Sequence, residues 1–306
     1  RVLRAALPDI PLHASTQMSI HNLAGVEAAA EMGITRAVLA RELSLEQIRF
    51  ISQHASIETE VFVHGALCFC HSGQCYMSAL IGRRSGNRGE CAQPCRWKYN
   101  LVEEHRPGQY MEIGETPDNG SYILNANDLC TAPFIDLICK AGVDSLKIEG
   151  RAKTFYYVAS VVSAYRRALD TFLADPYNDN FELPDAVIEE LNRTSHRHYS
   201  PGFYFGKEQA QQTPSHTYVR DWDFIGTVEG WENGIAHCTQ RGKFTAGDSI
   251  EILQPDGSVI PLAPAWIENA DGERVDATPH PMMQYTIPCE APLMPYSLIR
   301  MQKKAE

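Results

Sequence analysis

Four cysteines within a short stretch of the chain form the most specific chemical signal in the sequence. They are Cys68, Cys75, Cys91 and Cys95, with the spacing C-x6-C-x15-C-x3-C. Thiolates gathered by loops are ligands for a zinc ion or for the irons of an iron–sulfur cluster. The C-x3-C half suits zinc, whereas C-x6-C is wider than usual zinc spacing, so the spacing leaves both metals open. We predict a metal centre at these four cysteines.

The other five cysteines carry weaker signals. Cys70 and Cys130 are possible substitute ligands, and the sequence does not decide whether either one replaces a member of the four. The isolated Cys139, Cys238 and Cys289 are predicted to be packing residues, because cysteine is often buried. Nine cysteines without a secretory signal favour a reducing compartment, in which clustered cysteines bind metals more often than they form disulfides. We therefore expect a cytoplasmic protein.

A basic segment overlaps the cysteine motif, although the whole chain is acidic with a net charge of −11. Residues 83–98 contain five basic side chains against one acidic side chain. Such cations can bind a phosphate backbone, and an aromatic neighbour can stack an unpaired base. The alternative is a solvated charged face. The substrate-binding residues that we predict in this segment are Arg84, Arg88, Arg96 and Trp97.

Further candidate residues lie near the ends of predicted strands. Lys147, Glu149 and Arg151 alternate in sequence, and on a strand this period points all three toward one face. Near the carboxyl end of a barrel strand, such a face is typical of an active site, and the alternative is a buried ion network. We assign catalytic roles to these three residues and to His64, although a lone histidine is also typical of a core.

Three polar residues nearer the start of the chain are predicted to bind substrate. His13 and Gln17 share a face of the first predicted strand, and Arg41 ends the next one. Polar side chains that point in one direction can form the wall of a site or, alternatively, a polar layer over the core.

Alternating strands and helices must position these residues. This alternation is the pattern of a parallel sheet with helical crossovers. The predicted strands cover residues 11–16, 36–40, 60–64, 122–125 and 145–148. The predicted helices cover residues 22–32, 44–54, 132–141 and 154–173. Ser44 and Gln47 form a capping box at the start of the second helix.

We divide the chain into three parts. Residues 1–174 form a β/α barrel portion into which the cysteine segment 65–120 is inserted, residues 175–220 form a helical connector, and residues 221–306 form a small antiparallel β-barrel. About five strands are fewer than the eight of a closed β/α barrel. We therefore expect either an open sheet or a barrel that lacks its amino-terminal part. No stretch approaches 18 consecutive apolar residues, so we expect no membrane partner.

Several separate blocks resemble peptidase family U32, in the family's order. These blocks are residues 12–17 (LHASTQ), 39–45 (LARELSL), 60–96 and 145–151 (SLKIEGR). The resemblance implies a TIM-like β/α barrel and a [4Fe-4S] cluster on Cys68, Cys75, Cys91 and Cys95. In the RNA-acting members it also implies prephenate as a co-substrate. One bacterial group of the family forms 5-hydroxyuridine at the tRNA wobble position, and a relative hydroxylates a cytidine of 23S rRNA.

The resemblance implies a tRNA hydroxylase, because residues 106–111 and 120–125 resemble the tRNA group. Lys147 and Arg151 would suit a dicarboxylate such as prephenate, since arginine can hold a carboxylate with two hydrogen bonds. The alternatives are 23S rRNA hydroxylation, a collagenase-like peptidase, and a zinc-stapled module that binds RNA or protein. The chain has no H-E-x-x-H and no recognisable nucleophile motif, which disfavours a peptidase. The electron source and the oligomeric state, including a homo-oligomer, stay open.

Overall fold

The structure is a computed structural model, which describes residues 2–68, 70–97, 100–102, 110–112, 127–206 and 218–303. The chain divides into two compact units. The first unit comprises Arg1–Glu149, Asp175–Leu183 and His196–Tyr218, and the second comprises Gly150–Ala174, Pro184–Ser195 and Val219–Glu306. This grouping differs from the predicted boundaries, because two helical segments join the carboxyl-terminal residues. The predicted strand 122–125 lies outside the described residues.

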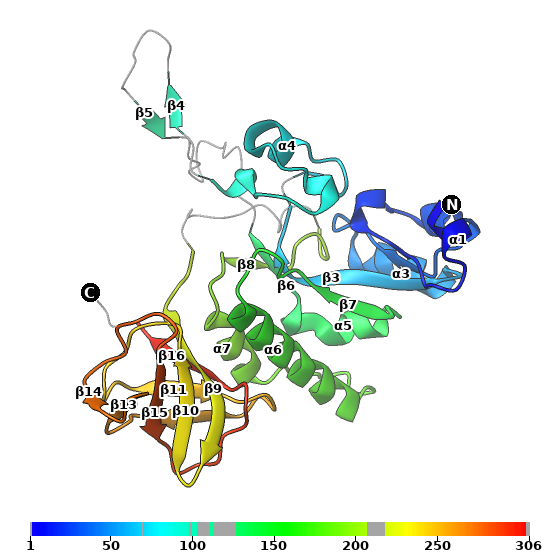
Figure 1. Cartoon of the computed structure of the whole chain (residues 1–306). Helices are drawn as coiled ribbons and strands as arrows, with labels where there is room; N and C mark the ends of the chain where they lie inside the picture. The colour runs from blue at the N-terminus through cyan, green and yellow to red at the C-terminus, as the bar shows by residue number, and fades with distance from the viewer. Residues whose placement is uncertain are drawn as a thin grey trace. The chain divides into compact units, whose positions relative to one another are not determined.

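The first unit is a mixed α/β structure (Figure 1). Its helices are α1 Val2–Ala6, α2 Leu23–Glu31, α3 Leu45–His54, α4 Met77–Gly82 and α5 Ile135–Lys140. Its strands are β1 His13–Ala14, β2 Arg36–Val38, β3 Glu58–Ala66, β4 Asn100–Val102, β5 Tyr110–Glu112, β6 Asp128–Cys130, β7 Ser145–Ile148 and β8 Tyr199–Ser200. Short 3-10 helices are η1 Thr16–Met18, η2 Gly86–Arg88, η3 Pro94–Arg96 and η4 Ala132–Phe134.

A six-stranded sheet organises this unit. Strands β1, β2, β3 and β7 run parallel, each beside the next in this order. Strand β6 pairs antiparallel with the carboxyl end of β3, and β8 pairs with β6. Helices α2 and α3 connect successive parallel strands, which confirms the predicted crossovers. The cysteine segment leaves the sheet where β3 ends at Ala66.

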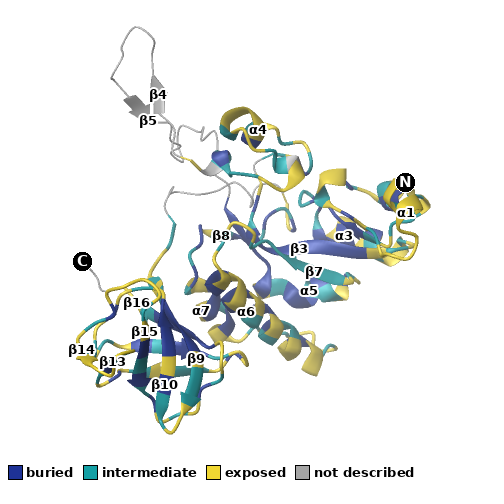
Figure 2. Ribbon diagram, viewed as in Figure 1, coloured by how far each residue is buried: buried dark blue, intermediate teal, exposed yellow. Residues whose placement is uncertain are grey.

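Local sequence signals explain where the two crossover helices begin. Ser44 Oγ accepts a hydrogen bond from Gln47 N at 3.3 Å, and Gln47 Oε1 accepts one from Ser44 N at 2.9 Å, so the predicted capping box is confirmed. Asn22 caps α2 by accepting from Gly25 N at 2.8 Å. In Figure 2, β3 is almost wholly buried, whereas the region of α4 is largely exposed.

The second unit contains a long helix, a short helix and an antiparallel sheet. The helices are α6 Phe155–Ala174 and α7 Asp185–Asn192. The strands are β9 Trp222–Glu232, β10 Ile235–Gln240, β11 Ile250–Leu253, β12 Val259–Leu262, β13 Ile267–Asn269, β14 Arg274–Val275, β15 Gln284–Pro288 and β16 Leu298–Gln302. Their order in the sheet is β12-β11-β16-β9-β10-β15-β13-β14. Among the described residues, no helix is long and apolar enough to cross a membrane.

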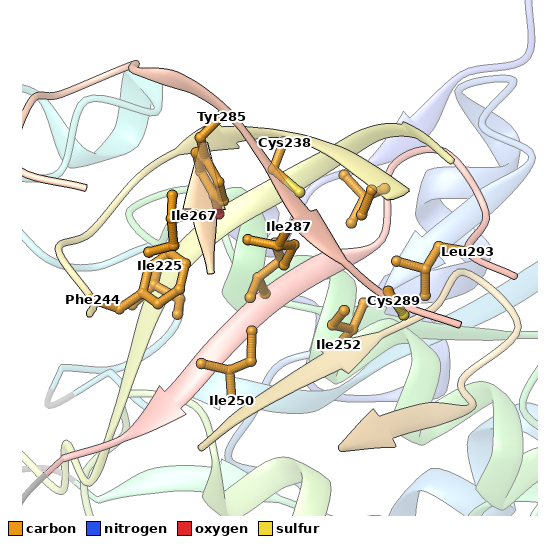
Figure 3. Close-up of a cluster of buried hydrophobic side chains, with 13 residues drawn as sticks. Ile225, Cys238, Phe244, Ile250, Ile252, Ile267, Tyr285, Ile287, Cys289 and Leu293 are labelled. Carbon is orange, nitrogen blue, oxygen red and sulfur yellow. The ribbon is translucent and has the colours of Figure 1, made fainter. Parts of the chain in front are cut away.

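An isoleucine-rich core fills the antiparallel sheet (Figure 3). Ile225, Ile252 and Ile287 are at most 1% exposed, and Phe244 and Tyr285 pack edge to face. Cys238 and Cys289 lie in the same core, which confirms that these two cysteines are packing residues. Because burial disfavours a thiolate, it raises the pKa of Cys238.

Candidate metal centre and its surroundings

The cysteine segment brings several thiols together. The pKa of Cys70 is raised to about 11, first by burial and then by a hydrogen bond with Cys75. The charges of Cys75, Cys95 and Cys68 raise it as well, so these three sulfurs lie close to Cys70. Cys70 therefore lies inside the group, although the sequence left its role open. Cys130, the other possible substitute, is buried on β6 opposite His64 of β3.

Cys91 belongs to the distal part of the same segment. Its Sγ accepts a hydrogen bond from Gln93 N at 3.3 Å, and a Cβ on Gly86 would lie 4.0 Å from this sulfur. All nine cysteines are free thiols. A set of sulfur donors on adjacent loops suits an iron–sulfur cluster or a zinc ion. The residues present fit such a group, whereas the choice among the cysteines as ligands stays a prediction.

Arg41 connects the cysteine segment to the parallel sheet. Its side chain is 8% exposed and donates from Nη1 to Cys68 Sγ at 2.7 Å. Its Nη2 lies 3.9 Å from Glu149 Oε2, and its guanidinium lies 3.7 Å from the centre of the Phe62 ring. An N–H donor beside a sulfur can hold that sulfur in the orientation that a metal ligand needs. The geometry therefore gives Arg41 a place at the candidate centre.

A second group of charges lies along the neighbouring strands. Lys147 Nζ is 2.8 Å from Glu60 Oε1, and Ser145 Oγ donates to Glu60 Oε2 at 2.9 Å. Burial raises the pKa of Glu60, but the hydrogen bonds from Lys147 and Ser145 lower it more, so the net shift is downward. Arg36 also pairs with Glu60, at 3.3 Å. Lys147 thus belongs to a partly buried ion network, which is the alternative to a catalytic role for this residue.

The sequence predicted that the three alternating residues at 147, 149 and 151 share one strand, and the structure contradicts this prediction. Strand β7 ends at Ile148, and Glu149 extends the pairing only by donating its N–H to His64 O at 2.9 Å. A turn then begins at Gly150, whose oxygen accepts from Lys153 N at 2.9 Å. Arg151 follows in that turn, in the second compact unit. The period-two argument fails because the strand is too short.

The predicted strand over residues 11–16 is also shorter than expected. Only His13 and Ala14 form it, because Ser15 Oγ accepts a hydrogen bond from Gln17 N and starts η1. His13 and Gln17 therefore do not share a strand face. His13 lines a cavity of about 690 Å³ at the amino ends of the strands, with Arg36 and Glu58. The cysteine segment follows the carboxyl end of β3, so His13 does not join the candidate centre.

His64 is completely buried within β3. Its ring lies 5.2 Å from the ring of Tyr199, which in turn stacks on His196 at 4.0 Å. His196 and Arg197 are each 5% exposed, so both side chains are buried near this ring stack. These contacts are those of a core histidine.

The surface of the cysteine segment exposes aromatic and cationic side chains. Tyr76 is 65% exposed and Trp97 is 48% exposed. Arg84 and Arg88 are exposed as well, whereas the side chain of Arg96 lies outside the described atoms. Planar aromatic rings beside cations suit the bases and phosphates of single-stranded nucleic acid. Leu80 and Ile81 add exposed apolar area to this surface.

Comparison with known proteins identifies the family. The model for peptidase family U32 matches residues 1–214, and the model for the peptidase family U32 C-terminal domain matches residues 220–300. The chain is 34% identical to "tRNA hydroxylation protein P1" of Bacillus subtilis, covering 98% of this chain and 71% of that protein. It is 34% identical to "tRNA hydroxylation protein P" of Escherichia coli, covering 91% of this chain and 70% of that protein.

Two further matches cover less of the chain or of the relative. A 23S rRNA 5-hydroxycytidine synthase of Escherichia coli is 38% identical over 64% of this chain and 28% of that protein. A crystal structure of the C-terminal domain of a Geobacillus thermoleovorans putative U32 peptidase is 32% identical, over 26% of this chain and 98% of that chain, with a TM-score of 0.25. Because the family models match both portions of the chain, it belongs to peptidase family U32.

Proposed function

We propose that this protein is an iron–sulfur-dependent RNA hydroxylation factor that forms 5-hydroxyuridine at the wobble position of tRNA. Two relatives that match more than nine-tenths of this chain are named as tRNA hydroxylation proteins, which supports tRNA as the substrate. The observation that carries the proposal is the group of thiols around Cys70, in which Cys68 accepts a hydrogen bond from Arg41. A cluster on these thiols would supply redox chemistry. Its proposed ligands remain Cys68, Cys75, Cys91 and Cys95.

The protein's own residues would bind and present the RNA. A base can be reached only when it leaves its stack, and a single-stranded anticodon loop presents such bases. We propose that Trp97 and Tyr76 stack on unpaired bases and that Arg84 and Arg88 bind the neighbouring phosphates. All four side chains are exposed on the cysteine segment, which supports this assignment. A tRNA substrate would place the protein in the cytoplasm.

Prephenate remains the proposed co-substrate, with Lys147 as a proposed contact. Lys147 and Arg41 both lie over the ring of Phe62, at 5.5 and 3.7 Å from its centre. Two cations on one ring would suit a carboxylate ligand, and arginine can donate two parallel hydrogen bonds to it. Arg41 is therefore a further proposed contact.

We also propose that the complete protein closes a TIM-like barrel and that the antiparallel sheet forms the smaller barrel. Strands β1, β2, β3 and β7 are parallel and sequential neighbours, as consecutive strands of a β/α barrel are. The chain spans about 70% of the length of the two tRNA-hydroxylating relatives, and the remaining strands of the barrel would come from additional sequence.

Two measurements test the proposed function. Anaerobically purified protein should contain about four irons and about four acid-labile sulfides per chain. In bacteria that lack their own tRNA hydroxylation factors, the protein with any missing amino-terminal segment should restore 5-hydroxyuridine, measured by nucleoside mass spectrometry. Cys75→Ala should lose both the iron and the modification, whereas the matched control Cys139→Ala should keep both. Unchanged 5-hydroxyuridine in the Cys75→Ala strain would sink the proposal.

The same experiment separates the alternatives. Hydroxycytidine in 23S rRNA, measured in parallel, tests the second candidate function, which the 38% identity to the rRNA synthase favours. Protein that binds one zinc and no iron would indicate the zinc-stapled binding module. Protein without any metal that cleaves collagen would indicate the peptidase.

A further inference from the structure

Three potential metal ligands that the sequence did not bring together meet beside the cysteine segment. They are His21, Glu42 and His71, and one ligand atom of each lies within 4.8 Å of the other two. His21 follows β1 and η1, Glu42 follows β2, and His71 follows β3. The group therefore lies where three parallel strands end, which is the edge at which open α/β sheets place their ligands.

The hydrogen bonds of His21 fix which of its nitrogens faces the group. Its Nδ1 is 2.7 Å from the backbone oxygen of Ser19, and because a carbonyl only accepts, Nδ1 must carry a proton. Its Nε2 is 3.4 Å from Glu42 Oε2. In a neutral imidazole, Nε2 would then present a lone pair to a carboxylate oxygen. Two acceptors at this distance repel each other, so the contact requires either a proton on Nε2 or a metal ion between the two atoms.

One carboxylate oxygen of Glu42 accepts hydrogen bonds, whereas the other has no hydrogen-bond donor among the described residues. Oε1 accepts from Ser72 N at 2.8 Å and from Ser72 Oγ at 3.3 Å. Oε2 is buried and has no hydrogen-bond partner among the described residues, although Nε2 of His21 is nearby. A proton between His21 Nε2 and Glu42 Oε2 would form a directed hydrogen bond, but the two atoms do not have the geometry of one. A buried carboxylate oxygen without a donor is therefore available to a metal ion.

The loops that carry the three residues are tied together. Ser19 Oγ donates to Ser72 O at 2.5 Å, and Gln74 Nε2 donates to Ser19 Oγ at 3.1 Å. Gly73, at φ +77°, lies so close to the Gln17 oxygen that a Cβ would be 2.7 Å from it. Ser72 and Ser19 thus hold both histidine loops and the carboxylate in place, as hydrogen bonds around metal ligands do.

We propose that His21 Nε2, the Glu42 carboxylate and His71 Nδ1 bind one divalent first-row transition ion, separate from the cysteine centre. Imidazole and carboxylate ligands suit Zn²⁺ and Fe²⁺, and three protein ligands leave further coordination positions open. Metal–ligand bonds of about 2.1 Å place neighbouring ligand atoms roughly 3.4 Å apart in a tetrahedron. The atoms of His21 and Glu42 are already 3.4 Å apart, and His71 Nδ1 is 3.9 Å from Glu42 Oε1. His71 is 77% exposed, so its ring can make this small approach.

Mn²⁺ is a suitable probe because it can bind the histidine and carboxylate ligands of this site but not the cysteines, since thiolates prefer softer metals. Anaerobically purified protein is titrated with Mn²⁺, and the electron paramagnetic resonance signal of unbound Mn²⁺ gives the stoichiometry and the Kd. We expect one Mn²⁺ per chain, displaced by Zn²⁺. His71→Ala and Glu42→Gln should each weaken binding at least about tenfold. The control His54→Ala, an exposed histidine on α3, should bind like the wild type.

The outcomes separate a metal site from an ordinary ion pair. No Mn²⁺ binding to the wild type would overturn the proposal and leave a protonated His21 paired with Glu42. Equal binding by the wild type, His71→Ala and Glu42→Gln would also overturn it, because the metal would then be bound elsewhere. Circular dichroism of each variant checks that it is folded, and His71→Ala, at an exposed position, keeps the test valid if a Glu42 variant does not fold. The result does not depend on RNA hydroxylation.

Discussion

Arg41 shows how one residue can link the cysteine segment to a sheet. Its guanidinium reaches Cys68, Glu149 and the face of Phe62, three groups that belong to different segments of the chain. Lysine could not reproduce this arrangement, because an ammonium group is a compact charge without the planar fork of arginine. Arg41 therefore does more than supply a positive charge.

We expect Arg41→Lys and Arg41→Ala to lower the metal content and the stability of the protein. A hydrogen bond to a charged group contributes about 1.5–3 kcal/mol, and Arg41→Ala also leaves Glu149 without this cation. Iron per chain and urea unfolding measure the two effects. Arg84→Ala is the control, because Arg84 is an exposed cation on the same segment. Full iron content and unchanged unfolding in Arg41→Ala would contradict this role.

Glu60 predicts a dependence of stability on pH. Its pKa lies below the ordinary value of 4.5, so its ionised form stabilises the folded protein at neutral pH. That contribution is fully present above pH 4.5 and is lost as the pH falls through the lower, folded-state pKa. Glu60→Gln should be less stable at pH 7, because Lys147 and Arg36 lose their carboxylate, and should show a smaller loss between pH 5 and pH 3. Urea unfolding at several pH values checks this, and parallel curves would disprove it.

At the scale of elements, the capping box at the start of α3 is a contact made entirely by local sequence. Ser44→Ala should destabilise the protein by about 1 kcal/mol, because the N–H of Gln47 loses its acceptor. Ser44→Gly should cost only a few tenths of a kcal/mol, since glycine is itself tolerated at this position. Urea unfolding of the two variants provides the comparison. Equal losses would show that the side-chain hydrogen bond does not stabilise the helix.

Elements with strong local signals could be predicted, whereas elements fixed by distant contacts could not. Strand β7 was predicted at Ser145–Ile148 and has these bounds, and the capping box placed α3 correctly. The strand predicted at 11–16 is too long, because the alternation of polar and apolar residues continues past Ser15, which caps η1. Strands β13 and β14 contain only three and two residues, which is too few for an alternating pattern to predict them.

In the candidate site, too, the features fixed by local sequence could be predicted and those fixed by distant contacts could not. The sequence indicated the cysteine group because its members are close in the chain. It left Cys70 undecided, because the spacing gives no information on which sulfurs meet in space. The approach of His21, Glu42 and His71 was also hidden, since these residues come from three separate loops. The sequence did carry one usable signal, which is that each of the three follows a predicted parallel strand.

At the scale of the whole molecule, the grouping of α7 with the antiparallel sheet has a physical cause in a buried arginine. Arg300 on β16 is fully buried and donates to Glu190 on α7 at 2.6 and 2.8 Å. It also pairs with Glu251 on β11 at 3.0 Å. Burial lowers the pKa of Arg300, but the hydrogen bonds and charge of Glu190 raise it more, so the guanidinium stays charged. Helix α7 is therefore held to the antiparallel sheet and belongs to its unit.

Glu190→Ala should destabilise the second unit by about 3–5 kcal/mol, because it leaves a buried guanidinium short of its main partner. Replacing both residues, Glu190→Leu with Arg300→Met, should recover most of that loss, since apolar side chains of similar volume carry no desolvation cost. Calorimetry of the full chain measures both. Asp170→Ala is the matched control, because it removes an exposed i, i+4 pair with Arg166 on α6 and should change stability by less than about 1 kcal/mol. If Glu190→Ala melts like the wild type, the buried network does not hold α7 to the sheet, and the grouping of this helix with the carboxyl-terminal residues must rest on its apolar face alone.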